Sequence, residues 1–263
     1  PFSGTRLEND ILGLDGEGIS MKLRARIIKA LMKKDFRMLA GNKNTFFILL
    51  LPILFCVLYT KVLPIGKETG MLYPLLLCEV LNLICAPISL LSMMVAEEKE
   101  KNTLRTLIMS DVRAMEFLAS KMFVVLLLME VISVTNYLLV GLDMKFFAGY
   151  MLISTLASIG ILFLGATVGI LSENQMSTGT ISTPLMLLLM LPPIFAGMNR
   201  VLEKIAFCLP TNAFMEIMNG EYRNKAAFLS GANMKHYAVC LVWIVIGIAV
   251  FNIVYKKRGV DSQ

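Results

Sequence analysis

The sequence predicts an all-α integral membrane protein that crosses the membrane with six helices. Composition is the first of three observations behind this prediction: hydrophobic residues make up 57% of the 263 residues, charged residues make up 17%, and the mean hydropathy is +0.72. A soluble domain of this length needs much more polar surface, whereas the outside of a membrane bundle can be as apolar as its core. An apolar soluble bundle is therefore a poor alternative.

Six apolar runs are the second observation. Each is close to the roughly 20 residues that cross a hydrocarbon core of about 30 Å. The fourth run contains Gly165 and Gly169 at a spacing that permits close contact between helices. The fifth contains Pro184, Pro192 and Pro193, so we expect it to be kinked, or to end early and re-enter the membrane. We place the six spans at Thr45–Leu63, Met71–Ala96, Met122–Gly141, Phe147–Leu171, Ile181–Met198 and Tyr237–Tyr255.

The third observation is where the basic residues lie. The positive charge, +6 net, gathers before the first run, between the second and third runs, and after the sixth. Lysine and arginine in short flanks mark the cytoplasmic side of a membrane and face anionic lipid. We therefore predict that both termini, including the tail at residues 259–263, are cytoplasmic, that anionic lipid is a partner, and that nucleic acid is not.

The chain ahead of the first span divides at Met21. Residues 1–20 hold acids and glycines but no apolar run, and we expect them to be a remnant of expression or a disordered segment, with Met21 as the natural start. Residues 21–44 predict an amphipathic helix in the headgroup layer, ahead of the six-span domain at residues 45–258. Its basic stripe repeats at spacings of four, three, four and four residues, and consists of Lys22, Arg26, Lys29, Lys33 and Arg37.

The long connection between the fifth and sixth spans predicts two short helices. Val201–Leu209 and Ala213–Met218 are apolar enough to be helical, and Pro210 separates them. Thr211 and Asn212 can cap the second helix with their side-chain oxygens. We expect both helices to dip into the outer leaflet of the membrane.

Two carboxylates lie inside the apolar runs. At about 1.5 Å per residue, Glu79 and Glu130 each lie roughly 12 Å inside the nearer membrane surface, where a charge costs on the order of 2.5–3.5 kcal/mol. Asn82 shares a helical face with Glu79, and Ser133 shares one with Glu130. These four residues line a translocation path, or lock the second and third spans together by hydrogen bonds, or relay protons in an ion-coupled carrier.

The segment after the second span, from Glu97 to Lys121, is the most informative stretch of the sequence. Its charges mark the point at which the second span leaves the membrane, and Asn102 and Thr103 can cap a new helix. One face of that helix is apolar and consists of Leu104, Leu107 and Ile108. A short, exposed apolar face needs the groove of a partner protein. On these residues alone, a solvated charged loop is the alternative.

This segment resembles the cytoplasmic signature of the type-2 exporter permeases of ATP-binding-cassette (ABC) transporters. The signature is rich in acids, continues with Gly-Thr-Leu-Glu, two further leucines, Thr-Pro-Val and a Glu, and closes with Gly-Lys. The chain departs from it at Asn102, Arg105, Ser110, Asp111 and Ser120. It matches at Glu98, Glu100, Thr103, Leu104, Leu107, Val112, Glu116 and Lys121.

The resemblance extends over residues 21–258 and implies the permease subunit of an ATP-driven exporter. In that family the loop after the second span is a coupling helix seated in a separate cassette ATPase, which binds ATP and Mg²⁺, and two identical or similar six-helix subunits face each other. Some branches resemble bacterial exporters of peptides, so a peptide is the first expected substrate and a lipid-like drug the second, at the plasma membrane. The residues that the resemblance assigns to ATPase coupling are Glu98, Glu100, Thr103, Leu104, Leu107, Ile108 and Glu116.

Catalytic chemistry has no candidate site in the sequence. The phosphate-binding Gly-x-x-x-x-Gly-Lys-Ser/Thr loop does not occur, so we expect no enzyme activity here and ATP hydrolysis in a partner chain. The one histidine, His236, lies beside the start of the sixth span without further ligands for a metal. The five cysteines lack metal-ligand and disulfide spacings, and we expect packing roles for them. A proton-driven carrier would leave the Glu97–Lys121 segment without a purpose, and the six spans show no inverted halves.

Overall fold

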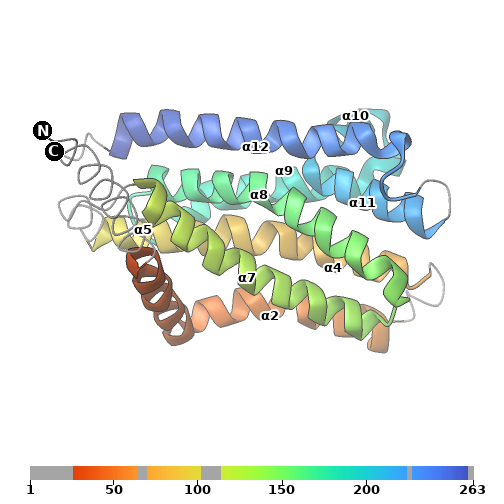
Figure 1. Ribbon diagram of the computed structural model, residues 1–263, viewed down its shortest axis with the longest axis horizontal. Coiled ribbons are helices and arrows are strands. Elements are labelled where there is room, and N and C mark those ends of the chain that lie inside the picture. Colours follow the sequence, from red (N-terminus) through yellow and green to blue (C-terminus); the bar gives the residue numbers. More distant parts are fainter. Residues whose placement is uncertain (1–25, 64–69, 102–113, 224–226, 260–263) are drawn as a thin grey trace, which may run out of the picture.

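The computed structural model describes residues 26–63, 70–101, 114–223 and 227–259, and within these ranges the regular structure is entirely helical. Six helical stretches are long and apolar enough to cross a membrane, and they run along one another in a bundle (Figure 1). The predicted all-α fold with six spans is therefore confirmed. The spans are Thr45–Val62, Leu72–Glu100, Glu116–Val140, Met144–Leu171, Thr178–Met198 and Gly231–Lys257.

Most spans combine an α-helix with a short π or 3₁₀ turn at an end or in the middle. The first three are α2 (Lys43–Val57) with η1 (Leu58–Val62), then α4 (Leu72–Ile84) with η2 (Cys85–Leu91) and α5 (Ser92–Glu100), and then α7 (Ala114–Val140). The last three are η3 (Met144–Phe146) with α8 (Phe147–Leu171), then α9 (Thr178–Phe195) with η4 (Ala196–Met198), and then η5 (Gly231–Asn233), α12 (Met234–Val254) and η6 (Tyr255–Gly259). Two shorter helices, α10 (Arg200–Phe207) and α11 (Pro210–Tyr222), connect the fifth span to the sixth.

Helix α8 is the centre of the bundle and packs against α12, η2, α5, α7 and α11. Glycine makes its closest approaches possible. A Cβ atom on Gly165 would lie 1.9 Å from the backbone oxygen of Pro87, and one on Gly169 would lie 2.7 Å from the backbone oxygen of Ser92. The close helix contact predicted at these two glycines is confirmed, and their partner is the second span.

The second span changes its helical geometry at η2, which is a π-helical segment containing Pro87. Proline has no backbone N–H and interrupts the hydrogen-bond ladder of an α-helix, and a local π segment is one way in which a helix accommodates such an interruption. Side chains bind two of the carbonyls near it. Ser92 Oγ donates to the Ser89 carbonyl at 3.0 Å, and Ser182 Oγ of α9 lies 3.5 Å from the Ile88 carbonyl.

Helix α9 runs through all three of its prolines, so of the two alternatives expected for the fifth span, a kink or an early end, the early end is wrong. One reason is a hydrogen bond from another element. Pro193 cannot donate to the carbonyl of Leu189 four residues earlier, and the hydroxyl of Thr211 donates to that carbonyl instead, at 2.8 Å. Thr211 was expected to cap its own helix, but it supports α9.

Helices α10 and α11 confirm the two short helices predicted between the fifth and sixth spans. Asn199 caps α10, because its side-chain oxygen accepts a hydrogen bond from the Val201 amide at 2.8 Å. Pro210 opens α11 at the first position, where its missing N–H costs nothing, and Leu209 is the N-cap residue without a side-chain cap bond. Helix α11 is largely buried against α12, α8, α4 and α9.

The two ends of the bundle differ in what they carry. At one end α5 finishes and α7 begins, and the helix at residues 26–41 lies there across the direction of α2 (Figure 1). Helices α10 and α11 lie at the opposite end (Figure 1). We call the first of these the charged end, because Glu97, Glu98, Lys99, Glu100 and Lys101 all lie in the last turn of α5 or directly after it.

Candidate functional site

A buried ion cluster joins three elements at the charged end. The ammonium nitrogen of Lys121 on α7 lies 2.7 Å from Asp35 Oδ1 and 3.1 Å from Glu98 Oε1, and Lys34 Nζ lies 2.6 Å from the same oxygen of Glu98. The side chains of Lys121, Asp35 and Glu98 are only 1–3% exposed. Because a buried charge is strongly destabilising without its partner, these contacts hold the helix at residues 26–41, the end of α5 and the start of α7 together.

Asp35 is the acid of this cluster that the sequence analysis did not identify. It lies between Leu31 and Leu39 on the buried face of the helix at residues 26–41. Burial raises the pKa of the Asp35 carboxyl, while the charge of Lys121 and its hydrogen bond act in the opposite direction. An acid at helical spacing between two leucines is the signal that could have revealed it.

The last turn of α5 also binds the end of α8 and the connection that follows. Lys99 Nζ donates to the carbonyls of Ile170 and Ser172, both at 3.0 Å. The last carbonyls of a helix lack intrahelical partners and carry partial negative charge, so a lysine placed there stabilises the helix end. Glu100 Oε2 accepts a hydrogen bond from the backbone amide of Gln175 at 3.1 Å. The last turn of the second span thus binds the end of the fourth span and the connection that leads to the fifth span.

Four of the residues predicted to couple to an ATPase, Thr103, Leu104, Leu107 and Ile108, lie outside the described residues. The other three are Glu98 in the ion cluster, Glu100 against Gln175, and Glu116 in the first turn of α7. The described part of the chain therefore places the two helices that enter and leave the predicted coupling segment, and shows that Lys121 and Glu98 bridge them directly.

The predicted basic stripe lies on the open side of the helix at residues 26–41. Arg26, Lys29, Lys33 and Arg37 are exposed, while Leu31, Asp35 and Leu39 are buried against the bundle. Lys22, the fifth member of the stripe, lies outside the described residues.

Inside the bundle, Glu79 is completely buried and receives hydrogen bonds from three spans. Its Oε1 accepts from Ser133 Oγ and Ser154 Oγ, each at 2.7 Å, and more weakly from Asn82 Nδ2 at 3.4 Å. Its Oε2 accepts from the Tyr150 hydroxyl at 2.5 Å. The structure brings Glu79, Asn82 and Ser133 together, and it adds two donors from α8 that sequence reasoning missed.

Glu130 lies outside this group, and no hydrogen bond joins it to Glu79 in the described part of the chain. Its Oε1 accepts from Thr155 Oγ1 of α8 at 2.7 Å. Its Oε2 is buried and has no hydrogen-bond partner. Glu79 and Asn82 bind Ser133 and so join the second span to the third, but Glu130 takes no part in these bonds. Both carboxylates also bind the fourth span, so α8 is the helix that they share.

Metal and thiol chemistry receive no support from the described residues. They contain no cluster of three or more histidine, cysteine or acidic side chains that could hold a metal ion. All five cysteines are free, and four of them are buried: Cys56, Cys78, Cys85 and Cys240.

Comparison with known proteins identifies a family. The family model described as ABC-2 family transporter protein matches residues 66–255, which is more than half of the chain and extends from just before the second span into the end of the sixth. No curated protein matches the chain.

Proposed function

The chain belongs to the ABC-2 family of transporter proteins and is a multi-pass permease subunit, and from this premise we propose that it couples ATP hydrolysis in a separate cassette ATPase to export of an amphipathic substrate. The observation that carries the proposal is the set of contacts made by the last turn of the second span. There, Glu98, Lys99 and Glu100 bind α7, the end of α8 and the connection that follows α8.

The coupling path follows from these contacts. Residues 102–113 connect α5 to α7, so a force on this segment acts on both helices. The Lys121–Glu98 pair makes the two ends move together, and Lys99 passes the same displacement to the end of α8. Because close-packed helices respond as rigid bodies, a small movement of an ATPase against residues 102–113 would shift the second, third and fourth spans as one unit.

We assign the charged end to the cytoplasm. In the type-2 exporter permeases that the chain resembles, the ATPase binds at this end. The exposed stripe of Arg26, Lys29, Lys33 and Arg37 also fits the anionic headgroups of a plasma membrane. We take this membrane to be bacterial. In this arrangement both termini are cytoplasmic, and the partner ATPase binds the ATP and Mg²⁺. Helices α10 and α11 then lie at the outer surface.

The active permease contains two such subunits, identical or similar, and we propose that they meet at α9. This helix leaves Leu187, Leu188 and Leu191 exposed, together with the hydroxyl residues Thr180 and Thr183. Polar side chains in a span avoid lipid and face other protein or water. The exposed residues in the middle of α12, by contrast, are all apolar, from Leu241 to Ala249.

An ion-coupled carrier that uses Glu79 and Glu130 is the alternative that the sequence left open. No observation favours it. Glu79 already receives hydrogen bonds at both oxygens, and among the hydrogen bonds of the described residues none joins it to Glu130. For the substrate, a peptide remains our first proposal, because the resemblance includes peptide-exporting branches, and a lipid-like drug our second.

The test separates transport from ATP hydrolysis in the reconstituted complex of the chain with its ATPase. We expect Glu100→Lys, the double variant Leu104→Asp with Leu107→Asp, and the charge reversal of Glu98 with Glu100 to abolish export while the ATPase still hydrolyses ATP. Glu203→Lys, on α10 at the opposite end, should leave export unchanged. Because Glu98 also belongs to the buried cluster, the Glu100 and leucine variants are the informative ones. Full ATP-driven export by both of them would refute the coupling assignment.

A further inference from the structure

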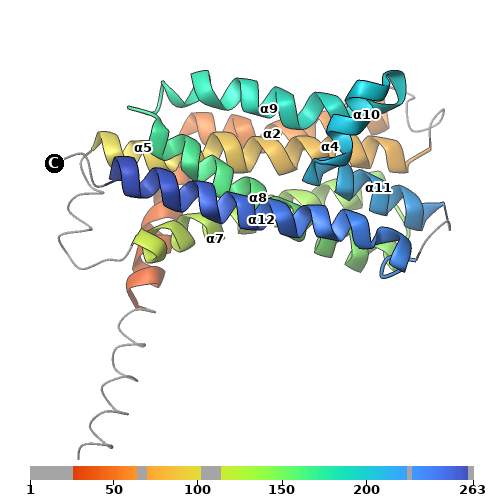
Figure 2. The same cartoon turned by 90° about the horizontal axis from the view of Figure 1, so that it is seen from above.

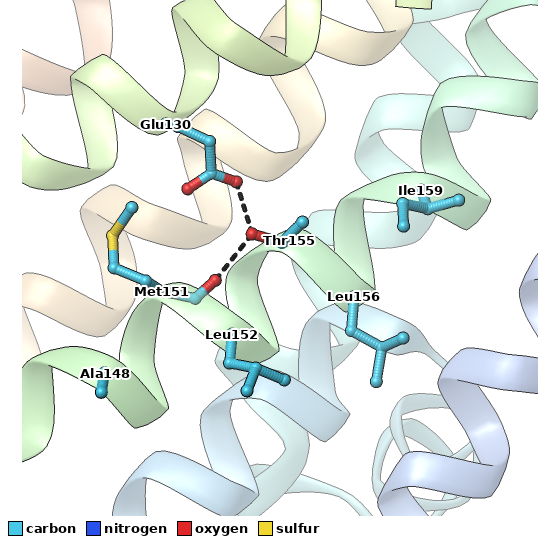
Figure 3. A pocket seen from close by; sticks show the side chains of 7 residues that line it. All are labelled: Glu130, Ala148, Met151, Leu152, Thr155, Leu156 and Ile159. Atoms are coloured by element: carbon cyan, nitrogen blue, oxygen red, sulfur yellow. Dashed lines mark hydrogen bonds between the residues drawn. The ribbon is translucent and has the colours of Figure 1, made fainter. Parts of the chain in front are cut away.

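An open pocket lies on the flank of the bundle where α7 meets α8. It has a volume of about 510 Å³ and is lined by one carboxylate, one hydroxyl and five apolar residues. Figure 3 shows Glu130 from α7 above a row of side chains along α8. The pocket is lined by Glu130, Ala148, Met151, Leu152, Thr155, Leu156 and Ile159. Its size is within the range of about 300–1,000 Å³ found for small-molecule sites.

The hydrogen bonding of Glu130 is incomplete. A carboxylate can accept about four hydrogen bonds, but Glu130 receives one, from a hydroxyl whose single hydrogen is shared between Glu130 Oε1 at 2.7 Å and the Met151 carbonyl at 2.8 Å (Figure 3). Glu130 Oε2 has none. The contrast with Glu79, whose two oxygens accept four hydrogen bonds, indicates that Glu130 retains the capacity to bind a ligand.

A cation would complement this carboxylate, and the sequence has no lysine or arginine at that depth. Glu130 lies ten residues before the end of its span at Val140, or about 15 Å from it. The sequence has no lysine or arginine from residue 122 to residue 144, nor from residue 146 to residue 199. In the remaining spans the basic residues lie at the ends, as Lys61, Lys99, Lys235 and Lys256 do. A second copy of the chain therefore has no cation to place against Glu130.

The pocket also opens away from the face that we assign to the second subunit. Figure 2 shows α9 and α7 on opposite sides of the bundle. Leu152, on the pocket wall, is 56% exposed, so a molecule dissolved in the bilayer can reach the site sideways.

We propose that this pocket binds a lipid-like amine, with the ammonium group donating to the Glu130 carboxylate and the alkyl chain lying along Leu152, Leu156 and Ile159. An ammonium supplies three donors and a full positive charge, and it removes the cost of an unpaired carboxylate in a membrane. The aliphatic lining buries one hydrocarbon chain, a smaller surface than an amphipathic peptide presents. The site deepens the second of our two substrate proposals, the lipid-like drug, and it rests on the proposed function only for the role of the amine as cargo.

The experiment uses the full chain in nanodiscs of neutral lipid and needs no ATPase. The probe is a dodecylamine with a photoreactive group on its alkyl chain, and the matched probe is the corresponding dodecanol. We expect the amine to label the helix turns around Leu152, Leu156 and Ile159, unlabelled dodecylamine to compete, and the alcohol not to label them. Glu130→Gln should lower the labelling at least about tenfold, which corresponds to a loss of about 1.4 kcal/mol in binding, because the amide removes the negative charge that pairs with the ammonium.

Two controls keep the test decisive. Asp143→Asn changes an exposed acid beyond the end of α7 and should leave labelling unchanged. Leu152→Trp fills the pocket at an exposed position, so it should block labelling with the carboxylate intact, even if Glu130→Gln fails to fold. Equal labelling by amine and alcohol, or undiminished labelling of Glu130→Gln, would overturn the site. A basic amphipathic peptide that competes better than dodecylamine would overturn the assignment to a lipid-like amine. Because binding is measured without ATP hydrolysis, its failure is distinct from a failure of coupled export.

Discussion

At the scale of single residues, Lys121 shows how the chain tolerates a cation in its interior. Lysine is almost never fully buried unless it is paired, and Lys121 has Asp35 and Glu98 within 3.1 Å. Its sequence position, at the end of the family signature, pointed to a role at the cytoplasmic surface. Its partners came from distant parts of the chain, 86 and 23 residues away, and no local pattern identifies such partners.

Lys121→Met is expected to destabilise the protein by about 3–5 kcal/mol, because it leaves the buried Asp35 carboxylate without its ion-pair partner and removes one cation from Glu98, which Lys34 still contacts. The control is Lys145→Met. Lys145 pairs with Asp143, and both side chains are largely exposed, so loss of this surface pair costs about 0–1 kcal/mol. Thermal unfolding in detergent measures both. Equal unfolding temperatures for the two variants would show that the buried cluster does not contribute to stability.

At the scale of elements, the interface of α8 with the second span depends on the absence of side chains. The Gly165 site faces the backbone of Pro87 in the π segment η2, and backbone cannot move aside as a flexible side chain can. Pro87 and Gly165 therefore belong to one packing arrangement, in which the π segment of one helix packs against a position on the other helix that has no side chain.

Gly165→Val should destabilise the bundle by about 3 kcal/mol or more, at the upper end of the cost of overpacking. Gly179→Ala is the control, since no atom lies within 4 Å of the position where its Cβ would be. That substitution should stabilise α9 by about 0.5–1 kcal/mol, the helical advantage of alanine over glycine. The two variants should change the yield of monodisperse protein and the unfolding temperature in opposite directions. A neutral Gly165→Val would mean that α8 and η2 separate more easily than their packing indicates.

Much of the architecture at this scale is predictable from the sequence, and the exceptions have physical causes. Run length and composition identify the spans and the two short helices, because those properties are local. The third span was predicted to begin at Met122, whereas the helix that forms it already includes Glu116 and Lys121, because the charge of Lys121 that seemed to end the apolar run is paired with Asp35 and Glu98. The prolines of α9 were misjudged because Thr211 of another helix supplies a missing donor. Tyr150 and Ser154 were missed because their role depends on where α8 lies relative to Glu79.

At the scale of the whole molecule, the six spans leave two different outer faces, and the proposed assembly uses one of them. We expect Leu188→Cys on α9 to form a disulfide between two subunits under mild oxidation, in a background that carries Cys208→Ser. Val245→Cys on α12 is the control, because Val245 is also exposed, at 67% against 52% for Leu188. This variant should remain monomeric because Val245 faces lipid. Non-reducing electrophoresis distinguishes the two. Cross-linking at Val245 and none at Leu188 would place the second subunit on the other side.

The buried ion cluster also limits how this permease can be recombined with its relatives. An exchange of residues 97–121 for the same stretch of another permease would insert a foreign lysine opposite Asp35, at a distance set by a foreign backbone. The buried Asp35 carboxylate of the N-terminal helix would then lack a lysine at hydrogen-bond distance. Chimaeras that swap the N-terminal helix and the connection between the second and third spans as a pair should assemble, whereas chimaeras that exchange only one of the two should be degraded.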